Sequence, residues 1–116
     1  MKSAPFLLAV AACQSAQAPS DAQAACDVTI SFSSYAMGID RKAAEAIEKL
    51  LAGSADAQEV TRSGGGREGE YALCVQSRDK AAASRLVERI RPLLPAKPRG
   101  PISVQGPNGR IDAPAR

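Results

Sequence analysis

The sequence predicts an α+β domain in which two helices cover one face of a four-stranded antiparallel sheet. Residues 26–32 alternate apolar and polar side chains, which is the period of a strand with one buried face. Residues 41–52 and 79–91 each carry an apolar stripe at helical spacing. Further strand patterns complete the order strand, helix, strand, strand, helix, strand. Right-handed crossovers then give the split βαβ, or ferredoxin-like, arrangement.

The first strand and the first helix are the best defined elements. Val28, Ile30 and Phe32 alternate with polar residues, so one face of this strand is expected to be buried. The predicted topology places it in the middle of the sheet beside the third strand. Asp40 is placed to cap the helix over 41–52, because a carboxylate accepts hydrogen bonds from free backbone N–H groups. The apolar stripe of this helix consists of Ala43, Ala46, Ile47, Leu50 and Leu51.

A hairpin follows the first helix. Residues 58–62 have one strongly apolar side chain, Val60, which predicts a strand at the edge of the sheet. Residues 63–66 form a turn, because consecutive glycines are unfavourable inside regular structure. Residues 64–69 match the letters of a dinucleotide-binding motif. That motif requires a following helix, whereas here the strand 70–76 follows, so we interpret the glycines as the hairpin turn.

The C-terminal third contains a basic helix and the last strand. Residues 79–91 carry most of the basic charge, and Pro92 ends or kinks this helix. Residues 102–105 alternate as a short strand, which completes a domain over 26–105. Residues 106–116 are expected to form a C-terminal tail.

The first 25 residues have the layout of an export signal, with a positive start, an apolar run and small residues. Residues 10–13, Val-Ala-Ala-Cys, resemble the bacterial lipobox. We therefore expect residues 1–12 to be a lipoprotein signal peptide and Cys13 to carry a fatty acyl anchor such as palmitate. Residues 13–25, rich in Ala, Gln and Ser, then form a flexible tether in the cell envelope, facing the periplasm.

Two other interpretations of this segment stay open. Residues 16–18 and 22–24, both Ala-Gln-Ala, fit the small-x-small rule of ordinary signal peptidase, which gives a soluble periplasmic protein. A chain that is not exported is the third possibility.

The cysteines support export. Acylation or removal of Cys13 leaves Cys26 and Cys74, which are expected to pair in an oxidising compartment. The predicted topology sets the start of the first strand against the end of the third, where these cysteines lie. The pleat opposes this pairing, because Cys74 points away from the face of its neighbours Leu73 and Val75, so Cys26 must leave the pleat or a bulge must shift the register. Two free buried cysteines are the alternative.

Composition argues against several functions. The chain has no histidine and two thiols are too few for a structural zinc site, so we expect no metal and no cofactor. Aromatic residues are 3% of the chain, and export removes the usual target of a nucleic-acid-binding protein. Net charge is +3, with six Lys/Arg against nine Asp/Glu in residues 1–77 and nine against three in 78–116.

The expected function is a non-enzymatic interaction domain of the bacterial envelope. Its partners are the membrane, through the lipid anchor, and an envelope protein or cell-wall component, but not nucleic acid. The predicted contact surfaces are the loop 33–40, the turn 64–69 and the basic helix 79–91. The candidate contact residues on the turn and helix are Arg67, Glu68, Glu70, Arg85 and Arg89.

The alternative function is peptidoglycan binding. The order of elements and residues 71–86 resemble the sporulation-related repeat domain, over most of the predicted domain. That resemblance implies a sheet that reads a glycan through aromatic side chains. This chain departs from the pattern, because Tyr35 and Tyr71 are its only tyrosines.

Overall fold

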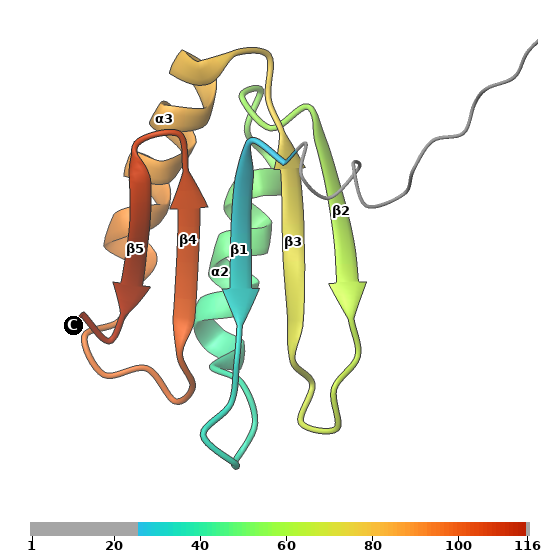
Figure 1. The fold of residues 1–116 in the computed structure, drawn as a ribbon, viewed down its shortest axis with the longest axis vertical. Coiled ribbons are helices and arrows are strands. Elements are labelled where there is room, and N and C mark those ends of the chain that lie inside the picture. Colours follow the sequence, from blue (N-terminus) through green and yellow to red (C-terminus); the bar gives the residue numbers. More distant parts are fainter. Residues whose placement is uncertain (1–25, 116) are drawn as a thin grey trace, which may run out of the picture.

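The computed structural model describes residues 26–115. The predicted signal peptide, the tether and Cys13 lie outside these residues. The described chain is a small α+β domain of two α-helices and an antiparallel sheet (Figure 1). Its elements are β1 (Val28–Phe32), α2 (Arg41–Ala52), β2 (Glu59–Gly64), β3 (Tyr71–Gln76), α3 (Lys80–Ile90), the 3-10 helix η1 (Arg91–Leu93), β4 (Ile102–Gly106) and β5 (Gly109–Ala113).

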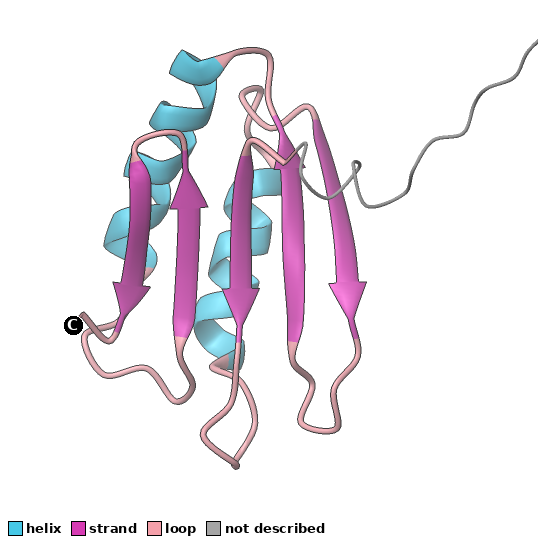
Figure 2. Cartoon of the chain, in the orientation of Figure 1, coloured by secondary structure: helices cyan, strands magenta, loops and turns pink. Residues whose placement is uncertain are grey.

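The strands lie in the order β2-β3-β1-β4-β5, and every neighbouring pair is antiparallel. Strand β1 is central, with Ile30 opposite Leu73 of β3 on one side and opposite Val104 of β4 on the other. Both helices lie behind the same face of the sheet (Figure 2). Within residues 26–115, the opposite face carries no helix.

The core lies between the helices and this one face of the sheet. Directly opposite residues of antiparallel strands share a face, so the alternation of β1 continues across its neighbours. The polar residues of the same strands point to the open face. The fully buried large side chains are Val28, Ile30, Phe32, Ile47, Leu73, Val75, Leu86, Ile90, Ile102 and Val104.

The sheet has five strands, so the expected number of four is wrong. Residues 109–113, which we expected within the tail 106–116, form β5. Pro107 and Asn108 connect the two strands, and Gly109, the first residue of β5, has a positive φ of 126°, which glycine adopts without steric cost. Burial of Ile111 and Ala113 on the helix-facing side then stabilises the added strand.

Strand β2 is an edge strand, as its single apolar residue predicted. All six of its side chains are exposed. The strand runs two residues beyond the expected 58–62, because Ser63 and Gly64 still pair with Ala72 and Tyr71 of β3.

Candidate functional site

Three connections meet at the end of the sheet where β1 and β2 finish (Figure 1). They are residues 33–40, 65–70 and 94–101, and we call this region the loop end. The opposite end of the sheet carries Cys26 and the connections 53–58 and 77–79, and we call it the disulfide end. Different interactions hold the segments together within each of these two regions.

The loop 33–40 is held in shape by one serine hydroxyl. Ser34 Oγ accepts hydrogen bonds from the backbone N–H groups of Ala36 and Gly38, each at 2.9 Å. The same hydroxyl donates to the carboxylate of Glu68 on the neighbouring turn. This hydroxyl therefore orders the loop and fastens it to the turn between β2 and β3.

Asp40 fixes the other side of the loop. The residue is 8% exposed, and its Oδ1 accepts from the N–H of Ala43 at 3.0 Å, which caps α2. Its Oδ2 accepts from the N–H of Arg99 at 3.0 Å, which ties residues 94–101 to the start of the helix. One carboxylate thus satisfies two backbone donors from separate segments.

The backbones of two connections also touch directly. A Cβ placed on Gly100 would lie 2.1 Å from the carbonyl oxygen of Ser33 and 3.1 Å from that of Gly38. Only a glycine fits this approach, because real Cβ atoms do not come so close to backbone oxygen. The loop 33–40 is therefore held against 94–101 along its length.

This ordered loop holds two large apolar side chains away from the core. Tyr35 is 59% exposed and Met37 is 88% exposed. Val60 on β2, at 41%, is the only other large apolar side chain exposed in residues 26–115. Exposed apolar groups on a restrained loop are typical of a contact surface, because the entropy of ordering them is already lost before binding.

Of the predicted contact residues, Arg67, Glu68 and Glu70 lie at the loop end. Glu68 is engaged with Ser34, while Arg67 is exposed. The structure thus joins two of the surfaces that the sequence suggested separately, the loop 33–40 and the turn 64–69.

Arg85 and Arg89 lie elsewhere, on α3. Arg85 Nη2 is 2.9 Å from Asp56 Oδ1, and Arg89 Nη1 donates to Ser54 Oγ at 3.4 Å. The hydrogen bond from Arg85 lowers the pKa of the Asp56 carboxyl below its ordinary value. These arginines fasten α3 to the connection 53–58, so the structure does not bring them together with the residues of the turn.

Sequence reasoning chose the loop 33–40 as a contact surface but named none of Tyr35, Met37 and Ser34 as a contact residue. A signal was available, because Tyr35 and Met37 fit neither the alternation of β1 nor the stripe of α2. The tie between Asp40 and Arg99 left no signal, since 59 residues separate the two in sequence.

A cavity of about 400 Å³ lies between α2 and the strands β2 and β3. Tyr71 donates its hydroxyl hydrogen to the carboxylate of Glu48, and the guanidinium of Arg62 lies 3.7 Å above the tyrosine ring. Burial, followed by the bond to Glu48, raises the pKa of Tyr71 to about 12. The tyrosine therefore stays protonated near neutral pH and acts as a hydrogen-bond donor, not as a general base.

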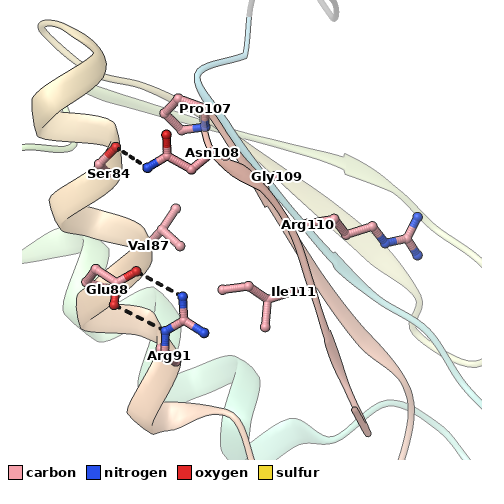
Figure 3. A pocket seen from close by; sticks show the side chains of 10 residues that line it. Ser84, Val87, Glu88, Arg91, Pro107, Asn108, Gly109, Arg110 and Ile111 are labelled. Atoms are coloured by element: carbon pink, nitrogen blue, oxygen red, sulfur yellow. Dashed lines mark hydrogen bonds and ion pairs between the residues drawn. The ribbon is translucent and has the colours of Figure 1, made fainter. Parts of the chain in front are cut away.

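A second cavity, of about 190 Å³, lies between α3 and the turn joining β4 and β5 (Figure 3). Asn108 donates to Ser84 Oγ at 3.1 Å across it, and Arg91 pairs with Glu88 at 2.9 Å on its wall. Small-molecule sites usually have volumes of roughly 300–1,000 Å³. This space is the seam where β5 packs on α3, and its polar groups bind one another.

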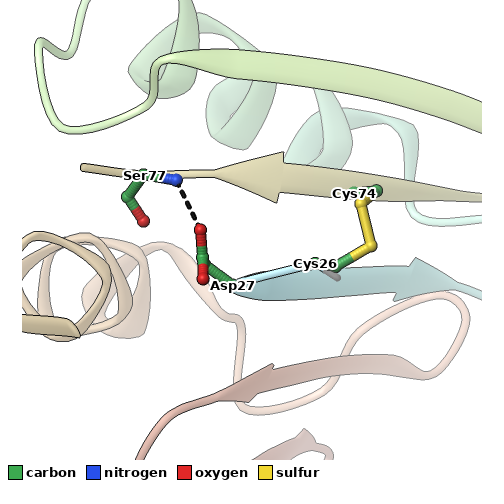
Figure 4. The surroundings of a disulfide bond; sticks show 4 residues. All are labelled: Cys26, Asp27, Cys74 and Ser77. Carbon is green, nitrogen blue, oxygen red and sulfur yellow. Dashed lines mark hydrogen bonds between the residues drawn. A yellow bond between two sulfur atoms is a disulfide. The ribbon is translucent and has the colours of Figure 1, made fainter. Parts of the chain in front are cut away.

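Cys26 and Cys74 lie at disulfide distance, with Cα atoms 5.3 Å apart (Figure 4). Cys26 precedes β1, which begins at Val28, so the alternation of the strand does not fix the direction of its side chain. The neighbouring Asp27 accepts from the N–H of Ser77 at 2.8 Å. Both interactions join the start of β1 to the end of β3.

The open face of the sheet differs from the face that the resemblance to the sporulation-related repeat domain implies. Within residues 26–115 it carries no aromatic side chain. Tyr71 lies on the helix-facing side, where its ring packs on Phe32 with centroids 5.0 Å apart, and Tyr35 lies in the loop. The open face presents small and polar residues, among them Thr29, Ser31, Ala72, Cys74 and Ser103.

No family model, curated protein or solved structure matches the chain. Within residues 26–115, no group of three or more potential ligands is placed to hold a metal ion. None of the helices in the same residues has the length and apolar character needed to cross a membrane. The candidate site therefore depends on the geometry of the loop end.

Proposed function

We propose that the protein is a non-enzymatic interaction domain of the bacterial envelope and that its contact surface is the loop end. One observation carries the proposal, namely the restrained loop that presents Tyr35 and Met37 to solvent. A loop without a role in binding has no need to keep two large apolar side chains ordered and exposed. The absence of histidine, the commonest general base, from the sequence favours binding over catalysis.

The proposal includes the location and the anchor. Residues 10–13 support lipidation of Cys13, and the pair Cys26–Cys74 supports an oxidising compartment. Residue 26, the first described residue, lies at the disulfide end (Figure 1). A tether that precedes it would therefore join the domain at the end opposite the loop end. A flexible tether would leave the loop end free to meet either the anchoring membrane or another partner.

The finer description of the fold is also a proposal. The order of the first four strands, β2-β3-β1-β4, supports a ferredoxin-like domain to which β5 has been added at one edge.

Cross-linking in intact cells, followed by purification from membranes, tests the proposed contact surface. We expect the wild-type chain to give a discrete cross-linked product, with a protein or with lipid, and Tyr35→Ser/Met37→Ser to lose it. Val60→Ser is the matched control, because Val60 is an exposed apolar residue on β2, outside the loop end. Equal cross-linking by the loop variant and the wild type would contradict the proposal.

Cys13→Ala tests the anchor separately. We expect this substitution to release the protein from the membrane fraction, and labelling with a palmitate analogue to disappear. A wild-type chain that carries no lipid, or that stays in the cytosol, would contradict the proposed location.

A further inference from the structure

Five exposed cationic side chains lie at the loop end or on the first residues of α2 beside it. Arg41 and Lys42 open α2 directly after the loop 33–40, Arg67 lies on the neighbouring turn, and Lys97 and Arg99 lie on residues 94–101. None of the five forms an ion pair within the described part of the chain. Their charge is therefore available to an external partner.

The basic helix differs from the loop end in this respect. Arg78 and Arg85 both pair with Asp56, at 3.6 and 2.9 Å, and Arg91 pairs with Glu88. The sequence concentrates positive charge on α3, but the fold uses much of that charge within the domain. Eight cations of residues 26–115 form no ion pair. Five of them lie around the exposed loop, and the other three are Lys49, Lys80 and Arg89.

The carboxylates of the loop end are fewer, and two of them are occupied. Asp40 is buried and accepts from two backbone N–H groups. Glu68 accepts from Ser34, and Glu70 is half-buried. Five exposed cations therefore stand against four carboxylates, the three above and Glu45, which is exposed on α2 one turn after Arg41.

From this arrangement we infer that the loop end docks on a lipid bilayer with anionic headgroups. The inference rests on the proposed function, because it names the partner of the same surface. Tyr35 and Met37 supply apolar groups that enter the boundary between headgroups and acyl chains, and the surrounding cations bind the headgroups.

The shape of the surface favours a bilayer over a small ligand or an acidic protein. Tyr35 and Met37 line neither of the two cavities described above, and they lie on a loop that projects beyond the strands (Figure 1). A projecting tip can enter a soft, flat interface with few side chains, whereas a stable protein interface needs about 800 Å² from each partner.

Vesicle sedimentation tests this inference with the full chain carrying Cys13→Ala, so that no acyl anchor contributes. We expect binding to vesicles that contain phosphatidylglycerol, weak binding to phosphatidylcholine alone, and loss of binding at high salt. Residues 1–25 are present in every variant, so any contribution from them is constant.

Two variants of the loop end, called tip variants below, separate the apolar and the charged contributions to vesicle binding. We expect Tyr35→Ser/Met37→Ser to bind anionic vesicles at least tenfold more weakly. We expect Lys97→Gln/Arg99→Gln to weaken binding by roughly fivefold for each charge removed. The matched control is Lys49→Gln/Lys80→Gln, which removes the same charge from exposed residues near the disulfide end and should bind as the wild type does.

Unchanged affinity of both tip variants, or an equal loss in the control, would overturn the inference. Equal binding to anionic and neutral vesicles would overturn it as well. Tyr35→Ser/Met37→Ser could lose its protein cross-link while its vesicle binding is unchanged or absent. In that case the loop end contacts a protein, so the proposed function stands and the lipid inference fails. Circular dichroism of each variant verifies that the fold is intact.

Discussion

The two ends of the sheet are stabilised in different ways. At the disulfide end, side chains link distant segments, through Cys26–Cys74 and the pairing of Arg85 with Asp56, beside backbone contacts such as that of Asp27 with the N–H of Ser77. At the loop end, Ser34 and Asp40 bind backbone N–H groups, Ser34 also binds Glu68, and the nearby cations form no ion pair. This difference teaches that a cross-link and ion pairs fasten one end, whereas hydrogen bonds order the other and leave the cations around it available for contact.

The largest expected effect breaks the disulfide end. The pair Cys26–Cys74 has a sequence separation of 48. Closing a loop of this size restricts the unfolded chain, so Cys26→Ser/Cys74→Ser should lower the free energy of unfolding by about 4 kcal/mol. Urea denaturation of the oxidised proteins measures the difference. Reductant should destabilise the wild type and leave the variant unchanged, and an insensitive wild type would refute the cross-link.

The next effect breaks the loop end. Gly100→Ala places a Cβ against the carbonyl oxygen of Ser33, so one connection must move away from the other. We expect a loss of about 3 kcal/mol in the free energy of unfolding, as for other substitutions that overpack a close contact. The control is Gly53→Ala near the disulfide end, where the nearest atom to a new Cβ is 3.7 Å away. Similar stabilities of the two variants would contradict the predicted packing.

A comparison of the two helix caps sharpens the contrast. Asp40 satisfies Ala43 and Arg99, whereas Asp79 accepts only from the N–H of Ala82, at 2.8 Å. We expect Asp40→Ala to cost about 2 kcal/mol, because it removes a cap and leaves a second backbone donor without its acceptor. Asp79→Ala should cost about 1 kcal/mol. Equal losses in thermal or urea unfolding would mean that the bond to Arg99 contributes nothing.

Sequence reasoning recovered the elements that repeat a local pattern. The alternation of Val28, Ile30 and Phe32 predicted a strand with one buried face, the order of elements placed it in the middle of the sheet, and a single apolar residue, Val60, predicted an edge. The same alternation occurs weakly in Ile111 and Ala113 of β5. Residues 106–116 were nevertheless expected to be a tail, because β5 is short and follows elements that already made a complete domain. Local patterns thus predicted the core but not the added edge strand.

The candidate site was only partly predictable, for a physical reason. A composition count identifies where cations occur in the sequence but not which carboxylates they meet after folding. Arg85 and Arg89 were expected to be available to a partner. Folding instead brings them to Asp56 and Ser54, which precede β2 in the sequence whereas the arginines follow it. Long-range pairing of this kind decides which charges remain free, and it leaves no local signal.

The smallest expected effect concerns Tyr71, on the loop-end half of β3. Tyr71→Phe removes the hydrogen bond to Glu48 and should cost about 1 kcal/mol near neutral pH, because the exposed carboxylate is rehydrated. The folded-state pKa is raised from 10.0 to about 12, so folding favours the protonated tyrosine. Its contribution is complete below pH 10 and is lost as the pH rises from 10 toward 12. Urea unfolding of the wild type and of Tyr71→Phe, from about pH 8 to about pH 11, measures this contribution. The wild type's advantage in the free energy of unfolding should shrink above pH 10. An advantage that stays constant would show that Tyr71 is not held protonated by its surroundings.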